Sequence, residues 1–402
     1  MKDWPDVGSG CFWAGVAWLL YVYAGYPCIL RLLVLLARVR HTTRDDYLPT
    51  VSVLIAARNE ERDIGWKLRE TLDWDYPADR LQILVASDAS EDRTDAVASS
   101  ILDPRLVLIR MEKRGGKVRA LNRLVPASSG EILCFTDANA HIDRANLRRM
   151  VRHFADLRVG SVTGRTRCIE GDASLAVGSG ASIYWDYESR INQLESDLGS
   201  VLVCDGALHC ARRTLYDPLM PDLASDLELP IRIRSRGYRN VFEPEATVLE
   251  NDTPSPHEEF TRRRRICGQG ALAMWRLRGT LHGFTAWQFL TRKVLRWLTL
   301  IPMLLVLVGT VLGMRQPFFR TLAAFQLLIY GVAVVTLLRT LSGRRTGRFF
   351  SVPFYAVLGA LGAFAGVLDT CLGRRYDVWE VPQSSRGQTE THHVEASKAP
   401  SL

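Results

Sequence analysis

The chain has 402 residues with a net charge of +8, and hydrophobic residues make up 47% of it. This length allows one sizeable soluble core together with membrane segments. The eight cysteines form no C-x-x-C pair, which argues against a zinc site and favours free thiols in a reducing compartment. Much of the positive charge lies beside apolar stretches, so it requires no nucleic acid partner.

Long apolar stretches lie at both ends of the sequence. They occupy residues 11–30, about 294–313, about 321–338 and about 349–368. Each is roughly the 20 residues that a helix needs to cross a bilayer. The first continues past Arg31 to Ala37 and is preceded by Asp3 and Asp6 rather than by basic residues, which favours an uncleaved anchor over a signal peptide.

The middle of the chain, residues 48–279, alternates short β-branched runs with amphipathic stretches. The predicted strands are Val51–Ala56, Leu81–Ser87, Leu106–Arg110 and Ile132–Thr136. The predicted helices are Glu60–Leu72, Glu91–Leu102 and Gly116–Val125. Strands that alternate with helices imply crossover connections, and therefore an α/β fold with a mostly parallel sheet flanked by helices.

Polar residues follow three of these strands directly: Arg58-Asn59-Glu60, Ser87-Asp88 and Asp137-Ala138-Asn139. The C-terminal ends of parallel strands meet at one edge of the sheet, where ligands of such folds bind. No G-x-G-x-x-G follows the first strand and no G-x-x-x-x-G-K-[ST] is present, which argues against dinucleotide and P-loop enzymes.

Several side chains near this edge suit a charged ligand. Asp137 and Asn139 offer oxygen atoms to a divalent cation, although a turn after a strand also favours Asp and Asn. Asp88 is available to bind a base or to cap the next helix. Lys117 opens a helix, where a cation and backbone N–H groups together suit phosphate, although a solvated lysine is the simpler explanation.

Two further candidates lie later in the sequence. Asp226 opens an amphipathic segment, where it either caps a helix or enters the site. Arg262–Arg265 is a run of four arginines, which a helix cannot point in one direction. One or two of them are expected in a site, and the others at lipid headgroups or in solvent.

Taken together, these segments resemble glycosyltransferase family 2, in particular the membrane-bound synthases of cellulose, chitin and hyaluronan. The segments that carry the resemblance are VSVLIAARNEE (51–61), VASDASEDRT (85–94), KRGGKVRALN (113–122), FTDANA (135–140), CDGALHCARR (204–213), SDLELPIRIRSRGYRNVFEPEA (225–246) and RRRRICGQG (262–270). Their order extends over nearly the whole chain, from the first anchor to Trp379. The resemblance implies the glycosyltransferase-A fold together with transmembrane helices.

The resemblance also implies roles for single residues. The residues that would meet the uridine of the donor are Ala56, Asn59 or Glu60, and Asp88. Lys117 would lie near the diphosphate, and Asp137 would bind Mg²⁺ or Mn²⁺ with Asn139 beside it. Asp226 matches the general base, and Arg265 matches the arginine of the Q-x-x-R-W motif.

Three departures from the family pattern affect these expectations. Asn139 replaces the usual second aspartate, which points to weaker metal binding or greater dependence on the diphosphate. Ser225 replaces the acidic residue before the base. Arg262 and Ile266 replace Gln and Trp of Q-x-x-R-W, and the missing Trp removes an aromatic surface for an acceptor sugar.

The predicted protein is a multi-pass enzyme of the cell membrane that transfers a sugar with inversion from a UDP-sugar to a saccharide acceptor in polysaccharide synthesis. The predicted regions are a membrane anchor with a basic linker (1–47), a cytosolic glycosyltransferase domain (48–280), an interfacial helix with C-terminal transmembrane helices (281–380) and a disordered tail (381–402). Three C-terminal spans would leave Arg374 and Arg375 outside, against the positive-inside tendency, whereas one re-entrant stretch would change this count.

Other functions remain open on the sequence alone. Transfer of a single sugar to a lipid acceptor would use the same site. A catalytically inactive membrane scaffold is favoured by Asn139, Ser225 and Ile266, but Asp88, Asp137 and Asp226 argue against it. Binding of nucleic acid through the arginine run would show a steep salt dependence and is the weakest of these alternatives.

Overall fold

The computed structural model describes residues 4–169, 176–251, 255–342, 344 and 347–376, so the predicted tail 381–402 lies outside them. The chain divides into two compact units. The sheet unit comprises Val39–Ile169, Glu188–Thr253 and Tyr376–Leu402, and the helical unit comprises Met1–Arg38, Glu170–Tyr187 and Pro254–Arg375. The region boundaries proposed from the sequence remain predictions.

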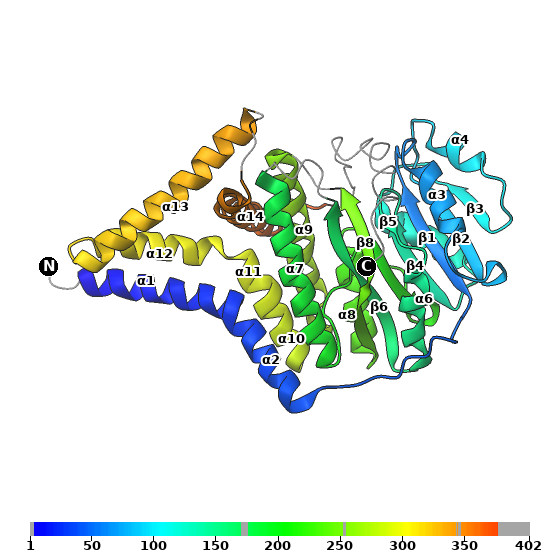
Figure 1. Cartoon of the computed structure of the whole chain (residues 1–402), viewed down its shortest axis with the longest axis horizontal. Coiled ribbons are helices and arrows are strands. Elements are labelled where there is room, and N and C mark those ends of the chain that lie inside the picture. The colour runs from blue at the N-terminus through cyan, green and yellow to red at the C-terminus, as the bar shows by residue number, and fades with distance from the viewer. Residues whose placement is uncertain (1–3, 170–175, 252–254, 343, 345–346, 377–402) are drawn as a thin grey trace. The chain divides into compact units, whose positions relative to one another are not determined.

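The sheet unit is built on an eight-stranded sheet with the order β3-β2-β1-β4-β7-β6-β8-β5 (Figure 1). The strands are β1 (Val51–Ala57), β2 (Leu81–Ser87), β3 (Leu106–Arg110), β4 (Ile132–Asp137), β5 (His141–Ile142), β6 (Val159–Ile169), β7 (Leu208–Arg212) and β8 (Arg239–Asn251). Strands β3, β2, β1 and β4 are mutually parallel, and β6 is parallel to β8. Strand β7 is antiparallel to both β4 and β6, and β5 is antiparallel to β8, so the sheet is mixed.

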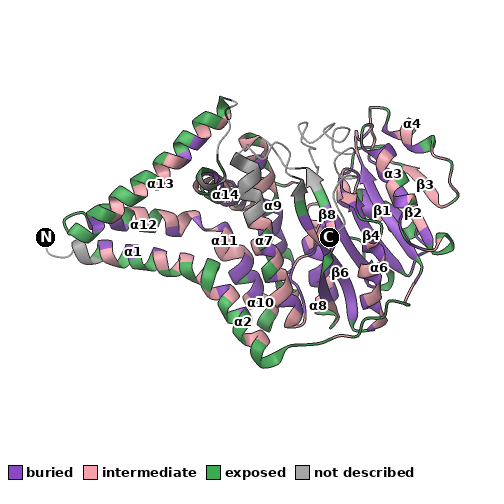
Figure 2. Cartoon of the chain, in the orientation of Figure 1, coloured by how far each residue is buried: buried purple, intermediate pink, exposed green. Residues whose placement is uncertain are grey.

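Helices cover both faces of the sheet. They are α3 (Ile64–Leu72), η2 (Ala78–Arg80), α4 (Thr94–Ser99), α5 (Lys117–Leu124), η3 (Val125–Ala127), α6 (Asn146–Val151), η4 (Arg152–Ala155), η5 (Arg213–Leu215) and α8 (Ser225–Ser235). Helix α7 (Ala176–Asp197) continues from the helical unit into the sheet unit. Because side chains alternate along β1, Val53 and Ile55 pack with Ile64 of α3 on one face, whereas Leu54 packs with Leu121 of α5 on the other. Both clusters are fully buried, as the purple strands in Figure 2 show.

The four predicted strands are confirmed, and their parallel arrangement agrees with the predicted crossover connections. The predicted helices 60–72 and 91–102 begin later than expected, at Ile64 and Thr94. Before α3 the chain forms a turn, in which the N–H of Asp63 donates to the carbonyl of Glu60 at 3.0 Å. This turn follows β1 at the C-terminal edge of the parallel strands, the edge at which ligands of such folds bind.

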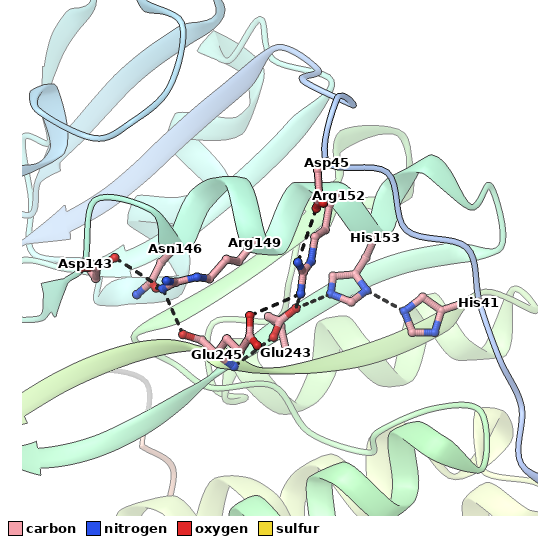
Figure 3. Close-up of polar contacts among 9 residues, drawn as sticks. All are labelled: His41, Asp45, Asp143, Asn146, Arg149, Arg152, His153, Glu243 and Glu245. Atoms are coloured by element: carbon pink, nitrogen blue, oxygen red, sulfur yellow. Dashed lines mark hydrogen bonds and ion pairs between the residues drawn. The ribbon is translucent and has the colours of Figure 1, made fainter. Parts of the chain in front are cut away.

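The first segment of the sheet unit, after the N-terminal helix, is attached to the rest of the unit by polar contacts in which His153 and Glu243 are buried (Figure 3). His153 Nε2 lies 2.8 Å from the carboxylate of Glu243 on β8, and His153 Nδ1 lies 2.6 Å from Nε2 of His41. A carboxylate only accepts, so His153 donates through Nε2 and accepts from His41 through Nδ1. Arg152 adds contacts to Glu243 at 2.8 Å and to Asp45 at 3.5 Å. The first segment of the sheet unit is thus held by ionisable groups.

Acidification is expected to weaken this attachment. Burial, followed by the neighbouring His153 and then by the positive charge of Arg239, lowers the pKa of His41 from 6.5 to about 4, while Asp156 and Glu243 oppose this shift. Between these two values the unfolded chain binds a proton at His41 and the folded chain does not, so the free energy of unfolding falls as the pH falls. Thermal unfolding from pH 7.5 to pH 5 should therefore depend less on pH in His41→Gln than in the wild type. Equal slopes for both proteins would contradict this assignment.

The helical unit contains the apolar stretches. Its helices are α1 (Trp4–Leu20), η1 (Tyr21–Gly25), α2 (Tyr26–Ala37), α9 (Pro256–Arg276), η6 (Arg278–Thr280), α10 (Gly283–Phe289), η7 (Leu290–Val294), α11 (Leu295–Trp297), α12 (Leu300–Leu312), α13 (Pro317–Leu341) and α14 (Arg348–Cys371). Within the described residues, three helical segments are long and apolar enough to cross a membrane: Val7–Ala37, Pro317–Leu341 and Phe350–Cys371.

The stretch predicted at 294–313 is not one straight helix. The helices Gly283–Trp297 and Leu300–Leu312 meet at a bend of 57°, so this pair is either a broken span or a re-entrant loop. Pro302 lies in the first turn of α12 and has no N–H to donate to the carbonyl of Leu298, which explains why the helix breaks at Leu298 and Thr299. The bend falls between the predicted interfacial helix and the apolar stretch that follows it.

Helices α9 and α14 make direct backbone contact. A Cβ atom at Gly366 of α14 would lie 2.1 Å from the carbonyl oxygen of Arg264 on α9. Arg264 also pairs with Asp369 of α14, with Nη2 2.8 Å from Oδ1. Arg262 and Arg263 pair with Glu259 on α9 itself, at 2.8 and 2.7 Å. Three members of the arginine run therefore have carboxylate partners within the helical unit.

Gly366→Val is expected to separate these two helices, because no side chain fits at a distance of 2.1 Å from a backbone oxygen. The loss of stability should be about 3 kcal/mol, the upper part of the range for overpacked sites. Thermal unfolding of the full-length protein in detergent measures it. Gly331→Val in α13 is the matched control, since nothing lies within 4 Å of a Cβ there. Equal melting temperatures for both variants would contradict the close contact.

Candidate functional site

The loops after β1 and β2 are joined to each other at the C-terminal edge of the sheet. Asn59 has a positive φ of 52°, accepts from the N–H of Glu91 through Oδ1 at 2.9 Å and donates its own N–H to Ser90. The N–H of Glu60 donates to Oγ1 of Thr94 at 2.7 Å, and Glu60 is buried. The predicted uridine contacts Asn59 and Glu60 thus lie in a rigid double loop.

The register of the strands places two more of the predicted residues nearby. Ala56 is the partner of Asp137 across β1 and β4, and Asp88 directly follows β2. Asp88 is buried, with Oδ1 accepting from Gly115 N–H at 2.6 Å and Oδ2 accepting from Gly116 N–H at 2.8 Å. Asp88 therefore does not cap α4, because its two oxygens hold the loop that enters α5.

This loop fixes the start of α5, whose first residue is Lys117. Gly116 has φ +85°, a left-handed conformation that glycine adopts without strain. Lys117 Nζ contacts the carboxylate of Asp137 and donates to the carbonyl of Gly206 at 3.0 Å. The lysine predicted for the diphosphate and the aspartate predicted for the metal are therefore in direct contact.

Asp226, on the first turn of α8, completes the group. A Cβ atom built on Gly206 would lie 3.7 Å from Oδ2 of Asp226 and 3.9 Å from Nζ of Lys117. Both side chains are thus within contact distance of one point beside Gly206. Asp88, Asp137 and Asp226 come from three distant parts of the sequence; Asp137 contacts the Lys117 side chain, Asp226 lies beside it at Gly206, and Asp88 holds the backbone of the two residues before Lys117.

The oxygen atoms of this site suit a hard divalent cation that arrives with a phosphate ligand. In the described part of the chain, no group of three or more His, Cys, Asp or Glu side chains is arranged to hold a metal ion. Mg²⁺ in nucleotide sites is commonly held by one or two carboxylates, with the substrate's phosphates completing the coordination. Asp137, with the partly exposed Asn139 two residues later, fits that pattern.

Asp205, which no sequence motif singles out, lies just before β7 and beside the end of β4. Burial, and less strongly the charges of Asp226 and Asp137, raise the pKa of Asp205 from 3.8 to about 6. Its chain neighbours contact the other site residues, since the N–H of Cys204 donates to the carbonyl of Asp226 at 2.9 Å and the carbonyl of Gly206 accepts from Lys117 at 3.0 Å. Arg265, in contrast, lies on α9 of the helical unit, and its matched role remains a prediction.

The family model for glycosyl transferase family 2 matches residues 52–217. This stretch contains β1 to β4 together with Asp88, Lys117, Asp137 and Asp205, and it ends before Asp226. The match supports a family 2 glycosyltransferase domain in this part of the chain. The narrower likeness to cellulose, chitin and hyaluronan synthases remains a prediction.

Curated relatives have similar sequences over part of the chain. The probable glycosyltransferase YdaM of Bacillus subtilis is 29% identical over 56% of this chain and 55% of its own length. The beta-monoglucosyldiacylglycerol synthase of Synechocystis is 30% identical over 41% of this chain and 37% of its own length. An N-acetylglucosaminyltransferase of Rhizobium meliloti is 27% identical over 52% and 53%. The chain thus spans about half the length, or less, of these relatives.

Among solved structures, the mannosyltransferase PcManGT of Pyrobaculum calidifontis in complex with GDP-Man and Mn²⁺ has a similar fold. The TM-score is 0.68 at 19% identity, and the alignment covers 92% of this chain and 99% of that one. This similarity confirms the predicted glycosyltransferase-A-like α/β fold, with a mixed sheet flanked by helices.

Proposed function

We propose that this protein is a membrane-bound inverting glycosyltransferase that uses a nucleoside diphosphate sugar, with a UDP-sugar as the predicted donor. One observation carries the proposal, namely that Lys117, Asp137 and Asp226 converge at the C-terminal edge of the sheet. Such a transfer requires a cation beside the diphosphate, a carboxylate that binds a metal and a carboxylate that accepts the proton of the acceptor hydroxyl. The family match over residues 52–217 supports the same class of reaction.

The proposed reaction is a single displacement at the anomeric carbon. The acceptor hydroxyl attacks this carbon while Asp226 takes up the hydroxyl proton, and the bond to the diphosphate breaks. Lys117 and the N–H groups of the first turn of α5 would face the leaving diphosphate, while Asp88 holds the preceding loop by accepting from the N–H groups of Gly115 and Gly116. Asp137 and Asn139 would hold Mg²⁺ or Mn²⁺, which supplies positive charge to the diphosphate when bound.

The acceptor is proposed to be a saccharide or a lipid. Transfer of one sugar to a lipid is the second candidate. Ile266 favours this candidate because the synthase motif has Trp at this position. Ile266 is 45% exposed on α9. The relative named beta-monoglucosyldiacylglycerol synthase supports this alternative as well. Donor sugars are cytosolic, so we place the sheet unit on the cytosolic side of the cell membrane.

A donor screen tests the proposed function. The full-length protein in lipid nanodiscs is incubated with Mn²⁺ and each common UDP- or GDP-sugar, together with lipid and oligosaccharide acceptors, and products are resolved by mass. We expect transfer from one donor, and the product mass separates a single addition from a polymer. The absence of both transfer and hydrolysis with every donor would contradict the proposal and would favour the inactive scaffold.

A further inference from the structure

Asp205 precedes β7, and the direction of that strand brings it to the site. Strand β7 is antiparallel to β4 and pairs Leu208 with Thr136, so the residues before β7 lie beside the end of β4, where Asp137 is found. Asp205 is partly buried, and it lies between Cys204, which is hydrogen-bonded to the backbone of Asp226, and Gly206, which is hydrogen-bonded to Lys117. Three carboxylates therefore share the surroundings of Lys117.

Every polar atom of Asp205 is fixed by the protein. Its N–H donates to Oγ1 of Thr163 at 2.7 Å, and its carbonyl accepts from Nδ1 of His209 at 2.8 Å. Its Oδ1 accepts from the N–H of Ala207 at 2.9 Å, and its Oδ2 accepts from the hydroxyl of Thr166. An ionised carboxylate has about four acceptor positions, so these two bonds leave capacity for a ligand.

The two neighbours of Asp205 contact the groups proposed to carry out the transfer. The N–H of Cys204 donates to the carbonyl of Asp226 at 2.9 Å, and the carbonyl of Gly206 accepts from Lys117 at 3.0 Å. The position of a Cβ on Gly206 lies 3.7 Å from Asp226 and 3.9 Å from Lys117, which is ordinary contact distance. The turn 204–206 thus forms the surface between Asp226, the proposed base, and Lys117, the cation proposed to face the diphosphate.

We propose that the turn 204–206 is the recognition surface for the transferred sugar, with Asp205 accepting hydrogen bonds from its hydroxyl groups and Gly206 leaving space for its ring. This inference rests on the proposed function, because the sugar must lie between the leaving diphosphate and the residue that deprotonates the acceptor. The Asp205 carboxylate is held by two hydrogen bonds and its backbone by two more, so it is preorganised to accept from hydroxyls, and charged acceptors form the stronger hydrogen bonds.

A sugar fits these observations better than a second metal ligand. Both carboxylate oxygens of Asp205 already accept from neutral donors of the protein, Oδ1 from the N–H of Ala207 and Oδ2 from the hydroxyl of Thr166, and sugar hydroxyls are neutral donors of the same kind. A carboxylate near two others is costly to bury. Hydroxyl donors from a sugar would offset part of that cost when the donor is bound.

Asp205→Asn tests the inference with little risk to the fold, because the amide oxygen accepts from Ala207 and the amide nitrogen donates to Thr166. Calorimetry on the full-length protein in nanodiscs with Mn²⁺ compares UDP with UDP-glucose and UDP-N-acetylglucosamine, and GDP with GDP-mannose. For the nucleotide sugar that the wild type binds, we expect affinity to fall by about tenfold in the variant, and affinity for the bare nucleotide to change by less than about twofold. Asp103→Asn, a partly buried aspartate paired with Arg105 outside the site, should change neither affinity.

Gly206→Ala provides a second test. The added methyl group meets nothing closer than 3.7 Å, so the variant should fold, but the methyl group occupies space assigned to the sugar. The nucleotide sugar should again lose affinity while the nucleotide does not, and Gly279→Ala, with nothing within 4 Å, should leave both unchanged.

The failures of the two proposals are distinguishable. If Asp205→Asn and Gly206→Ala leave the affinity for the nucleotide sugar unchanged, or weaken nucleotide and nucleotide sugar equally, the role of the turn is overturned and the proposed function stands. If the wild-type protein binds none of these nucleotides or nucleotide sugars, the proposed function fails first, and the inference about the turn fails with it.

Discussion

Asp226→Asn is expected to lower the turnover number by roughly 10²–10⁴-fold, the usual contribution of a positioned general base. An amide of the same shape accepts no proton from the attacking hydroxyl, so only the chemical step is affected. The backbone carbonyl of Asp226, which accepts from Cys204 at 2.9 Å, is unchanged by the substitution and should keep the turn 204–206 in place. Donor affinity should therefore remain close to that of the wild type.

Transfer kinetics and calorimetric donor binding, measured on the same nanodisc preparation, separate these two effects. Asp79→Asn, an exposed aspartate in η2, is the control and should behave as the wild type. Near wild-type turnover in Asp226→Asn with donor binding intact would mean that another group takes the proton. Asp205, which neighbours Asp226, would then be the first residue to test.

Asp137→Asn is expected to remove most of the Mn²⁺-dependent activity, with turnover reduced by about 10²–10³-fold because stabilisation of the diphosphate charge is lost. The substitution removes the carboxylate that contacts Lys117 and that would hold the metal. The Mn²⁺ concentration that gives half-maximal activity should rise together with this loss. A metal titration of the transfer rate measures both quantities.

Asn139→Asp supplies the matched contrast. It restores a second carboxylate two residues after Asp137, so half-maximal activity should need less Mn²⁺ than in the wild type. If Asp137→Asn titrated with Mn²⁺ as the wild type does, the metal would be bound elsewhere. If Asn139→Asp raised the Mn²⁺ requirement, the side chain at position 139 would not face the metal.

The parallel half of the sheet was predictable because its signals are local. Residues 51–57, 81–87 and 132–137 are apolar runs that end in polar residues, and the structure makes each of them a strand of the same direction. The antiparallel half was not predictable in this way. Strand β7 is adjacent to β4 although α6, β6 and α7 lie between them in sequence, so its direction depends on long-range packing.

The same reason explains which site residues were found. Asp137 ends one parallel strand and Asp88 follows another, so the topology of the sheet is sufficient to place both residues at its C-terminal edge. Asp205 precedes an antiparallel strand, and a residue at the start of a strand reaches this edge only when the strand runs in reverse. The C-D-G sequence before LHCAR was the available signal, because a turn of this kind before a buried run marks a strand start.

The membrane segments show a similar contrast. Hydropathy was sufficient to locate the apolar stretches, and three of them form helices long enough to cross a membrane. The bend of 57° before α12 depends on one residue, Pro302, within an otherwise apolar stretch. The mean hydropathy of this stretch is not changed by the missing backbone N–H of Pro302. The number of membrane spans therefore could not be derived from hydropathy.

The anomeric configuration of the transferred sugar tests the central claim most directly. Proton NMR of the reaction with an α-linked nucleotide sugar reports the configuration of the first product formed. A single displacement, with Asp226 deprotonating the acceptor opposite the diphosphate near Lys117 and Asp137, predicts a β-linked product. An α-linked first product would require a different chemical path and would contradict the assignment of these three residues to one direct transfer.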